Sequence, residues 1–320
     1  MKKYILAFSA FVIFIMFFAF IISKGNDDGT ATEEFTEYSD HIDQQVPVDT
    51  LETLIDSSSE IALVNKDMAE SQSSLPQNLS NYPEQIIKRI AYTVSYNNST
   101  KCPNWVYWCL TKDHTDGPYS RKGMPYYEDD GTVAGIGVVS DENFRYGYFL
   151  DTDVKGPRQE FHDWADKSYH VNHGHICPAG DNRWSKAAMN QSFYLTNMCP
   201  QDIDLNGGDW EGLERRCRGW AKRYGEIHIV AGPIFYTKEY RTMGEGKVGV
   251  PDAFFKVILR NGRESKGIAF IFPNEGTHRD LVQYVKTIDE VESSTGFDFF
   301  TQLPDEIENE IESVSDLNEW

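Results

Sequence analysis

Three histidines fall within six residues of this 320-residue chain, and their spacing limits the chemistry that they can serve. His170, His173 and His175 begin the segment His170–Asp181, and Cys177 follows two residues after the last of them. Imidazole and thiolate are zinc ligands, but donors so close along the chain crowd a tetrahedral site. A single neutral imidazole can instead act as a general base near pH 7. Ordinary loop histidines are the third interpretation, and this segment alone leaves all three open.

A second group of polar residues, in the segment 197–214, adds oxygen donors. Asn197 begins the motif Asn-Met-Cys-Pro-Gln, while Asn206 and Glu214 bound Asn-Gly-Gly-Asp-Trp-Glu-Gly-Leu-Glu. On a helix, an offset of eight residues is about 80° around the axis, so Asn206 and Glu214 can share a face. Taken singly, Asn206 beside two glycines also fits a turn or N-cap, and Glu214 before two arginines fits a solvated helix face.

The elements that must position these residues are predicted from residue type and periodicity. Asp209–Arg223 keeps its apolar residues at helical spacing, with Trp210 and Leu213 assigned to the core, and Gly225 favours a helix end. Stretches of β-branched and aromatic residues predict strands. They cover Ala91–Ser95, Trp105–Thr111, Ile227–Ala231, Phe254–Leu259 and Gly267–Phe272, and Asp305–Val314 forms a further, acidic helical run. The mixture predicts one α+β domain over residues 86–315.

Together the two polar groups resemble the DNA/RNA non-specific endonucleases, the ββα-metal group that includes endonuclease G. That family has Asp-Arg-Gly-His, then Asn-x-x-Pro-Gln, then Leu-Asn-x-x-x-Trp-x-x-Leu-Glu, and the second and third motifs are complete here. Further likeness extends from about Tyr92 to Phe300 and includes Pro103–Trp105, Val230–Ile234 and Pro251–Lys256. The resemblance implies a ββα-metal (His-Me finger) nuclease domain with a central, mostly antiparallel sheet.

The resemblance also implies roles for individual residues. His175 would be the general base that takes a proton from the attacking water. Asn206 would bind Mg²⁺ or Mn²⁺ through its side-chain oxygen, Glu214 would hydrogen-bond to metal-bound water, and Asn197 would support the site. The implied activity is metal-dependent hydrolysis of phosphodiester bonds in DNA and RNA without sequence preference. Because some relatives pair, a homodimer is compatible with the resemblance.

One departure from the family motif concerns the residues before the base. Where the family has Asp-Arg, this chain has Asn172 and His173. Arginine is always charged and forks onto two phosphate oxygens, whereas histidine is mostly neutral at pH 7. Activity could therefore be lower, favour acidic pH, or use another cation, with Arg121 the first candidate and Arg183 a weaker one. The departure also motivates an alternative: a protein that binds nucleic acid on the nuclease fold but turns over little. A second alternative is an extracytoplasmic metal-binding protein that uses the His/Cys cluster.

The net charge of −20 argues at first against a polyanionic partner, but the charge is unevenly distributed. Residues 26–85 contain 14 acidic side chains against one Lys, residues 276–320 contain 12 against two basic ones, and residues 86–275 are neutral. The predicted helix contains a basic run whose default interpretation is solvated surface, and which could also follow phosphates. It consists of Arg215, Arg216, Arg218, Lys222 and Arg223.

The N-terminus predicts a membrane anchor or a signal peptide. Two lysines precede a nearly uninterrupted apolar run from Tyr4 to Ile22, close to the roughly 20 residues that span a bilayer. The lysines place the remainder outside the cytoplasm, in the cell envelope or secreted. Composition then divides the chain into an anchor or signal (1–24), an acidic disordered linker (25–85), the folded domain (86–315) and a tail (316–320). Five cysteines allow a disulfide or two, but without a Cys-x-x-Cys pair a structural zinc site is not expected.

Overall fold

The structure, a computed structural model, describes residues 75–119, 125–127, 133–136, 144–145, 148–260 and 265–320. All of the described residues belong to one compact unit. The predicted anchor, most of the predicted linker and Arg121 lie outside the described residues. Within the described part of the chain, no helix has both the length and the apolar character needed to cross a membrane.

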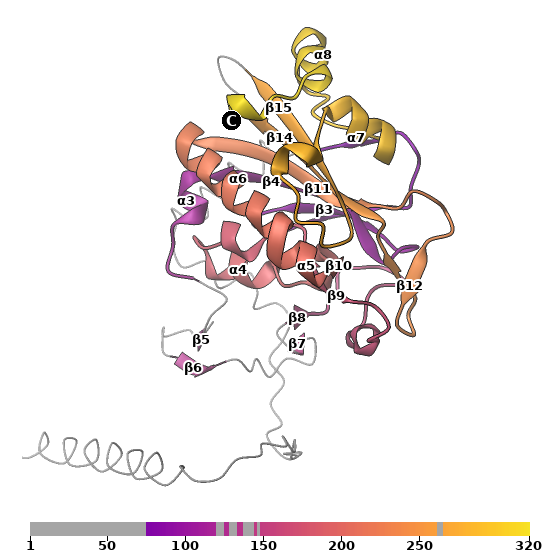
Figure 1. The fold of residues 1–320 in the computed structure, drawn as a ribbon. Helices are drawn as coiled ribbons and strands as arrows, with labels where there is room; N and C mark the ends of the chain where they lie inside the picture. Colours follow the sequence, from indigo (N-terminus) through magenta and orange to yellow (C-terminus); the bar gives the residue numbers. More distant parts are fainter. Residues whose placement is uncertain (1–74, 120–124, 128–132, 137–143, 146–147, 261–264) are drawn as a thin grey trace, which may run out of the picture. The chain divides into compact units, whose positions relative to one another are not determined.

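A seven-stranded antiparallel sheet forms the centre of the domain, in the order β16-β15-β14-β11-β4-β3-β2 (Figure 1). Its strands are β2 (Gln85–Lys88), β3 (Thr93–Asn97), β4 (Cys102–Thr111), β11 (Glu226–Ile234), β14 (Ala253–Arg260), β15 (Lys266–Pro273) and β16 (Val285–Lys286). All five predicted strands belong to this sheet, with ends shifted by a few residues. The predicted α+β class and the central antiparallel sheet are therefore confirmed.

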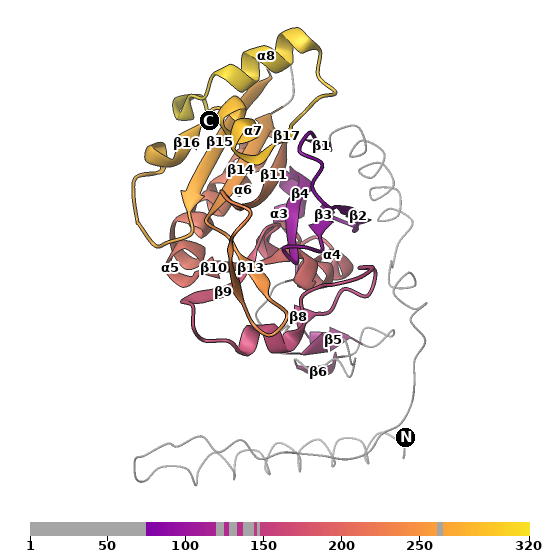
Figure 2. The same ribbon diagram turned by 90° about the vertical axis from the view of Figure 1, so that its right-hand side faces the viewer.

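The two faces of the sheet are covered by different helices (Figures 1 and 2). Helix α6 (Glu211–Tyr224) packs on one face against β4 and β11, while α7 (Ile288–Thr295) and α8 (Asp305–Ser313) pack on the other face against β15. Side chains alternate between the faces along each strand. Trp108 and Ile229 lie in the core beneath α6, and Tyr107 and Val230 lie in the opposite core. Both cores are apolar, which explains why the central strands contain almost continuous hydrophobic runs.

Helix α6 agrees with its prediction at its C-terminal end and differs at its start. Gly225 ends the helix at φ 91°, a conformation that disfavours residues with a Cβ. Trp210 and Leu213 are fully buried, as predicted. At its start, α6 continues from the short helix α5 (Ile203–Leu205) through a π-helical turn, η5 (Asn206–Trp210). The sequence predicted a regular helix there.

Shorter elements complete the described part of the domain. The strands outside the central sheet pair as β1 (Gln77–Asn78) with β17 (Phe297–Asp298), β5 (Pro125–Tyr127) with β6 (Val133–Ile136), β7 (Phe144–Arg145) with β8 (Tyr148–Phe149), β9 (Val171–His175) with β10 (Met198–Asp202), and β12 (Arg241–Met243) with β13 (Val248–Val250). The remaining helical segments are α3 (Lys112–Thr115), α4 (Lys186–Gln191), η2 (Phe161–Ala165), η3 (Ala179–Asp181), η4 (Leu195–Asn197), η6 (Leu281–Tyr284) and η7 (Leu317–Glu319).

Both ends of the folded region extend beyond the limits drawn from composition. Strand β1 pairs with β17, so the paired structure begins ahead of residue 86. At the other end, residues 316–320 are not a separate tail. Trp320 is 8% exposed and its ring lies 5.1 Å from that of Trp220 and 6.2 Å from that of Tyr224. Long-range burial of one aromatic side chain outweighs the polar composition around it.

Candidate active site

The antiparallel pair of strands β9 and β10 holds His175, the last residue of β9. The antiparallel register places His175 opposite Met198 and Gly174 opposite Cys199. Gly174 is required by this pairing, because a Cβ there would come within 2.4 Å of the Cβ of Gln201. The imidazole of His175 is 9% exposed and meets Phe193 edge to face, with ring centroids 5.0 Å apart. The ring is therefore confined to a mostly apolar rim, with limited access to solvent.

Asn197 fixes the backbone that follows His175. Its side-chain Nδ2 donates to the carbonyls of Cys177 and Ser192, each at 2.8 Å, and its Oδ1 accepts from the backbone N–H of Cys177 at 2.9 Å. The backbone N–H of Ile176 donates to the Asn197 carbonyl at 3.0 Å. Asn197 is fully buried. All three of these side-chain hydrogen bonds go to backbone groups, so Asn197 holds the backbone after His175 in place.

Asn206 is the first residue of the π-helical turn η5, which is joined to the end of strand β9. The indole Nε1 of Trp210, four residues later, donates to the backbone carbonyl of His175 at 3.2 Å, which joins this turn to the end of β9. Asn206 is not the N-cap considered from its sequence, because the Asp202 carboxylate caps α5 through the N–H groups of Asp204 and Leu205. Asn206 is half-buried, and within the described residues its side-chain amide has no hydrogen-bond partner. Single π-turns inside helices occur frequently at functional sites.

Glu214 lies on α6, where both acidic and basic side chains influence its carboxyl group. Burial raises the pKa of its carboxyl to about 7, partly opposed by the positive charge of Lys256. Asp181 raises the same pKa and Arg218 lowers it. Glu214 in turn contributes to the raised pKa of the Cys177 thiol, which places it near the residues that follow His175. Burial therefore outweighs the two nearby positive charges in setting the pKa of Glu214.

Two cations beneath this region were not recognised as functional from the sequence. Lys256 is fully buried in β14, with Nζ 4.0 Å from the ring centroid of Trp210 and without a hydrogen-bond partner in the described structure. Arg218 forms a 2.9 Å ion pair with the buried carboxylate of Asp181, which also accepts from Trp108 Nε1 at 3.0 Å. The sequence feature that could have indicated Lys256 is its place as a lysine inside an otherwise apolar strand. Arg218 was hidden within a basic run.

The remaining side chains of that basic run are mostly engaged locally. Arg215 pairs with Glu211 at 2.7 Å, Lys222 pairs with Asp116 at 3.0 Å, and Arg223 stacks on Tyr224. The solvated-surface interpretation therefore describes these three residues better than a continuous phosphate-binding stripe does.

The sequence indicated no role for Gln201, the last residue of the Asn-x-x-Pro-Gln motif. It is fully buried against Gly174, and both Nε2 and Oε1 lack hydrogen-bond partners among the described residues. A buried amide with neither end bonded to protein is uncommon and points to a bound water or ligand.

His173, at the family's arginine position, lies between two aromatic rings. Its imidazole stacks on Trp164 at a centroid distance of 3.6 Å and on Tyr148 at 3.9 Å. The two stacked aromatic rings hold the half-buried imidazole in one orientation. Unlike an arginine, it has no guanidinium that could bind two phosphate oxygens at once. Arg183 also differs from a phosphate ligand, because its guanidinium donates to the backbone carbonyls of Gly117 and Tyr119. Arg121 lies outside the described residues, so its candidacy stays a prediction.

The histidine-rich segment does not form a metal cluster among the described residues. Groups of His, Cys, Asp or Glu with donor atoms within 4.8 Å of one another occur elsewhere, and none includes His170, His173, His175 or Cys177. His170 instead faces Asp204 at 3.6 Å. The five cysteines, all of them described, form no disulfide. The zinc interpretation of this segment is therefore not supported.

Comparison with known proteins gives a consistent result. Residues 71–306 match the family model described as DNA/RNA non-specific endonuclease. Nuclease C1 of Cunninghamella echinulata var. echinulata is 31% identical over 232 residues, covering 68% of this chain and 83% of that protein. The mitochondrial nuclease EXOG of Mus musculus is 28% identical over 228 residues, covering 66% of this chain and 56% of that protein. The chain thus spans little more than half the length of the EXOG relatives.

A solved structure has the same fold. The crystal structure of the EndoG/EndoGI complex matches with a TM-score of 0.57 and 22% identity, covering 78% of this chain and 94% of the matched chain.

Proposed function

This chain belongs to the DNA/RNA non-specific endonuclease family, and from that premise we propose that it hydrolyses phosphodiester bonds of DNA and RNA with a divalent metal ion. The observation that carries the proposal is the bond from Trp210 Nε1 to the His175 carbonyl. It joins the end of β9 to the helical turn that begins with Asn206. An imidazole base and an oxygen donor for a metal are thereby held on neighbouring elements. Contact with backbone phosphates alone would make cutting independent of sequence.

We propose the following roles for the protein groups. His175 accepts the proton of the attacking water, since a neutral imidazole is a competent base near pH 7. Asn197 keeps the His175–Cys177 backbone in position through its three hydrogen bonds. His173 lines the approach and, when protonated, offers a positive charge to a phosphate. Arg121 is the candidate for a permanent positive charge.

The donor set fits a hard divalent cation, for which we propose Mg²⁺, with Mn²⁺ as a substitute. Asn206 would hold the ion through its side-chain oxygen, and Glu214, eight residues further along on α6, would hydrogen-bond to its waters. A cation there would oppose the effect of burial, which raises the pKa of the Glu214 carboxyl to about 7. When bound, such an ion neutralises charge that develops at the phosphate. Few protein ligands suit Mg²⁺, because it retains most of its waters.

The test is digestion of plasmid DNA and of a structured RNA by the full-length chain, with Mg²⁺ and with excess EDTA. We expect cutting in Mg²⁺ and none in EDTA. His175→Ala should lower the rate by roughly 10²–10⁴-fold, the usual contribution of a general base, and Asn206→Ala should abolish Mg²⁺-dependent cutting. The matched control is His170→Ala, which removes an exposed histidine five residues away. Cutting that survives EDTA, or that is unchanged in His175→Ala, would contradict the proposal.

The alternative of a binding protein with little turnover rests on His173 at the arginine position. It predicts retention of nucleic acid in a filter-binding assay, together with no cleavage by the wild type at any pH from 5 to 8. Metal-dependent cleavage at any pH in this range would favour the enzyme.

We further propose that residues 1–24 tether the domain outside the cytoplasm. The support is the apolar run flanked by lysines on one side and acidic residues on the other. Membrane fractionation of the full chain, compared with a chain lacking residues 1–24, tests this. Equal partitioning of both into the soluble fraction would refute a retained anchor.

A further inference from the structure

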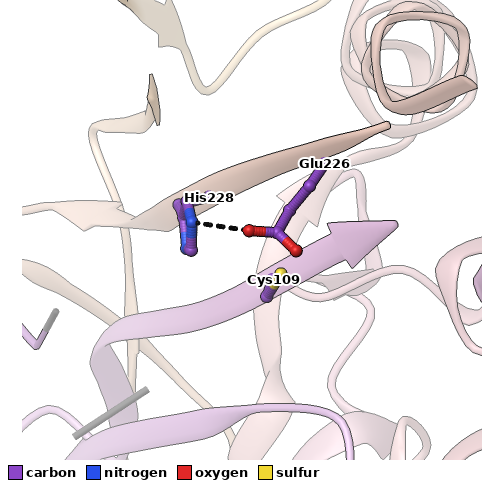
Figure 3. Close-up of side chains that lie close together, drawn as sticks. All are labelled: Cys109, Glu226 and His228. Carbon is purple, nitrogen blue, oxygen red and sulfur yellow. Dashed lines mark ion pairs between the residues drawn. The ribbon is translucent and has the colours of Figure 1, made fainter. Parts of the chain in front are cut away.

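We propose that Cys109, Glu226 and His228 form a zinc site on the face of the sheet opposite the candidate nuclease site. Their donor atoms, the Cys109 Sγ, a Glu226 carboxylate oxygen and a His228 ring nitrogen, all lie within 4.8 Å of one another. Figure 3 shows the three side chains converging from two neighbouring strands. A thiolate, an imidazole and a carboxylate are the ligand types of zinc sites in proteins.

The sheet register brings the three residues together. Cys109 on β4 lies directly opposite His228 on β11. Glu226, also on β11, lies opposite Thr111, the last residue of β4. Because side chains two positions apart on a strand point to the same face, Glu226 and His228 share a face with Cys109. It is the face of Tyr107 and Val230, whereas the α6 core lies on the other face. The backbone therefore holds these positions together before any metal binds.

His228 is already oriented as a metal ligand. Its Nδ1 lies 2.8 Å from the Tyr107 hydroxyl, and its Nε2 lies 3.2 Å from the Glu226 carboxylate (Figure 3). In the tautomer with the proton on Nδ1, Nδ1–H donates to the Tyr107 hydroxyl and the Nε2 lone pair is directed at the cluster. Metal-bound histidines are commonly oriented by such a hydrogen bond from their other ring nitrogen. The same geometry argues against a Cys–His nucleophile pair, because both ring nitrogens lie beside oxygen atoms of other residues.

The cluster is accessible to an ion from solvent. The side chain of Glu226 is 48% exposed and that of His228 is 13% exposed. Cys109 also borders a surface cavity lined by Tyr107, Thr93 and Tyr92. Two donors on one tetrahedral zinc are about 3.6 Å apart, given Zn–N and Zn–S lengths of about 2.1 and 2.3 Å. His228 Nε2 and the Glu226 carboxylate, 3.2 Å apart, are already near that spacing, and all the donor atoms lie within 4.8 Å of one another. The exposed Glu226 side chain can adjust around an ion, and water would fill the fourth position.

Cobalt titration of the full-length chain tests the site, because Co²⁺ bound to a thiolate gives a charge-transfer band in the near ultraviolet. The protein is stripped with a chelator, kept reduced, titrated with Co²⁺, and then with Zn²⁺. We expect one equivalent of Co²⁺ to produce the band and Zn²⁺ to displace it. Zn²⁺ should also raise the Tm. Cys109→Ser should abolish the band, Glu226→Gln and His228→Ala should weaken binding about tenfold or more, and Tyr107→Phe should weaken it about 10–100-fold.

Two matched controls separate this site from other metal-binding groups. His170→Ala removes a histidine that faces an acidic residue without a neighbouring thiol, and it should bind Co²⁺ as the wild type does. Asn206→Ala, which alters the candidate nuclease site, should also keep the band. Absence of the band in excess Co²⁺, or an unchanged band in Cys109→Ser, would overturn the proposal. If the buried variants unfold, Glu226→Gln decides, since its side chain is exposed, and unchanged Co²⁺ affinity in that variant also overturns the proposal.

Discussion

At the scale of single residues, the candidate site depends on amide side chains that hold backbone in place. Replacing Asn197 by Ala would leave the Cys177 N–H and the carbonyls of Cys177 and Ser192 buried without their partner. An orphaned buried group costs about 1–3 kcal/mol. We therefore expect Asn197→Ala to lower the free energy of unfolding by about 3–5 kcal/mol in urea denaturation. Asn190→Ala, on the half-exposed side of α4, is the control and should change it by less than about 0.5 kcal/mol.

The aromatic stack around His173 leads to a second residue-scale prediction. Arginine also stacks on aromatic rings and, unlike histidine, is charged at every physiological pH. We expect His173→Arg to raise kcat/KM on plasmid DNA about tenfold at pH 8, the value of one charge-assisted hydrogen bond. The gain should shrink toward pH 5.5, because an ordinary histidine carries most of a positive charge there. A folded His173→Arg protein that is slower than the wild type at every pH would show that the position does not face phosphate.

At the scale of elements, the β9–β10 strand pair positions the proposed base through the close contact between Gly174 and Gln201. A methyl group at Gly174 would lie 2.4 Å from the Gln201 Cβ, so Gly174→Ala must displace β9 from β10. We expect a lower Tm together with a loss of Mg²⁺-dependent cutting, because His175 is the next residue. Gly219→Ala is the matched control. Gly219 lies in α6, and a methyl group added there would meet nothing within 4 Å, so alanine should stabilise the helix by about 0.5–1 kcal/mol. Equal Tm values for the two variants would contradict the claim that Gly174 is needed for β9 to pair closely with β10.

At the scale of the whole molecule, the excess of acidic residues includes a cluster between α7 and α8. Burial, together with the charges of Glu292, Glu308, Asp289 and Asp298, raises the pKa of Glu312 to about 8. Burial likewise raises the pKa of Glu292 to about 7. A carboxyl whose pKa is higher in the folded state binds more protons there than in the unfolded chain. Stability contributed by these groups is therefore lost as pH rises from about 4.5 to 8.

This linkage predicts that the Tm falls between pH 5 and pH 8, and that Glu312→Gln removes much of the fall. At pH 8 we expect the variant to melt about 3 °C or more above the wild type, as about 1 kcal/mol produces in a domain of this size. Glu306→Gln, on the exposed side of the same helix, is the control. A Glu312→Gln protein with the wild-type pH profile would contradict the raised pKa.

The sequence by itself determined the elements whose signals are local. Strand residues, helical periodicity, the Gly225 end of α6 and the buried Trp210 were all predictable, since each depends on neighbours within about one helical turn or one strand. The linked motifs around His175 and Asn206 also identified the family without any coordinates. Even so, the π-helical turn at Asn206–Trp210 was not predicted, because the regular offset of about 80° assumed α-helical geometry throughout.

Only the tertiary structure decided which distant residues meet. Lys256 beneath Trp210, Arg218 on Asp181, Trp320 against Trp220, and Cys109 opposite His228 each join segments far apart in the chain. Such pairs depend on sheet register and on which face of a strand or helix is covered. A one-residue change of register would exchange the faces of every side chain, so no short sequence window contains that information.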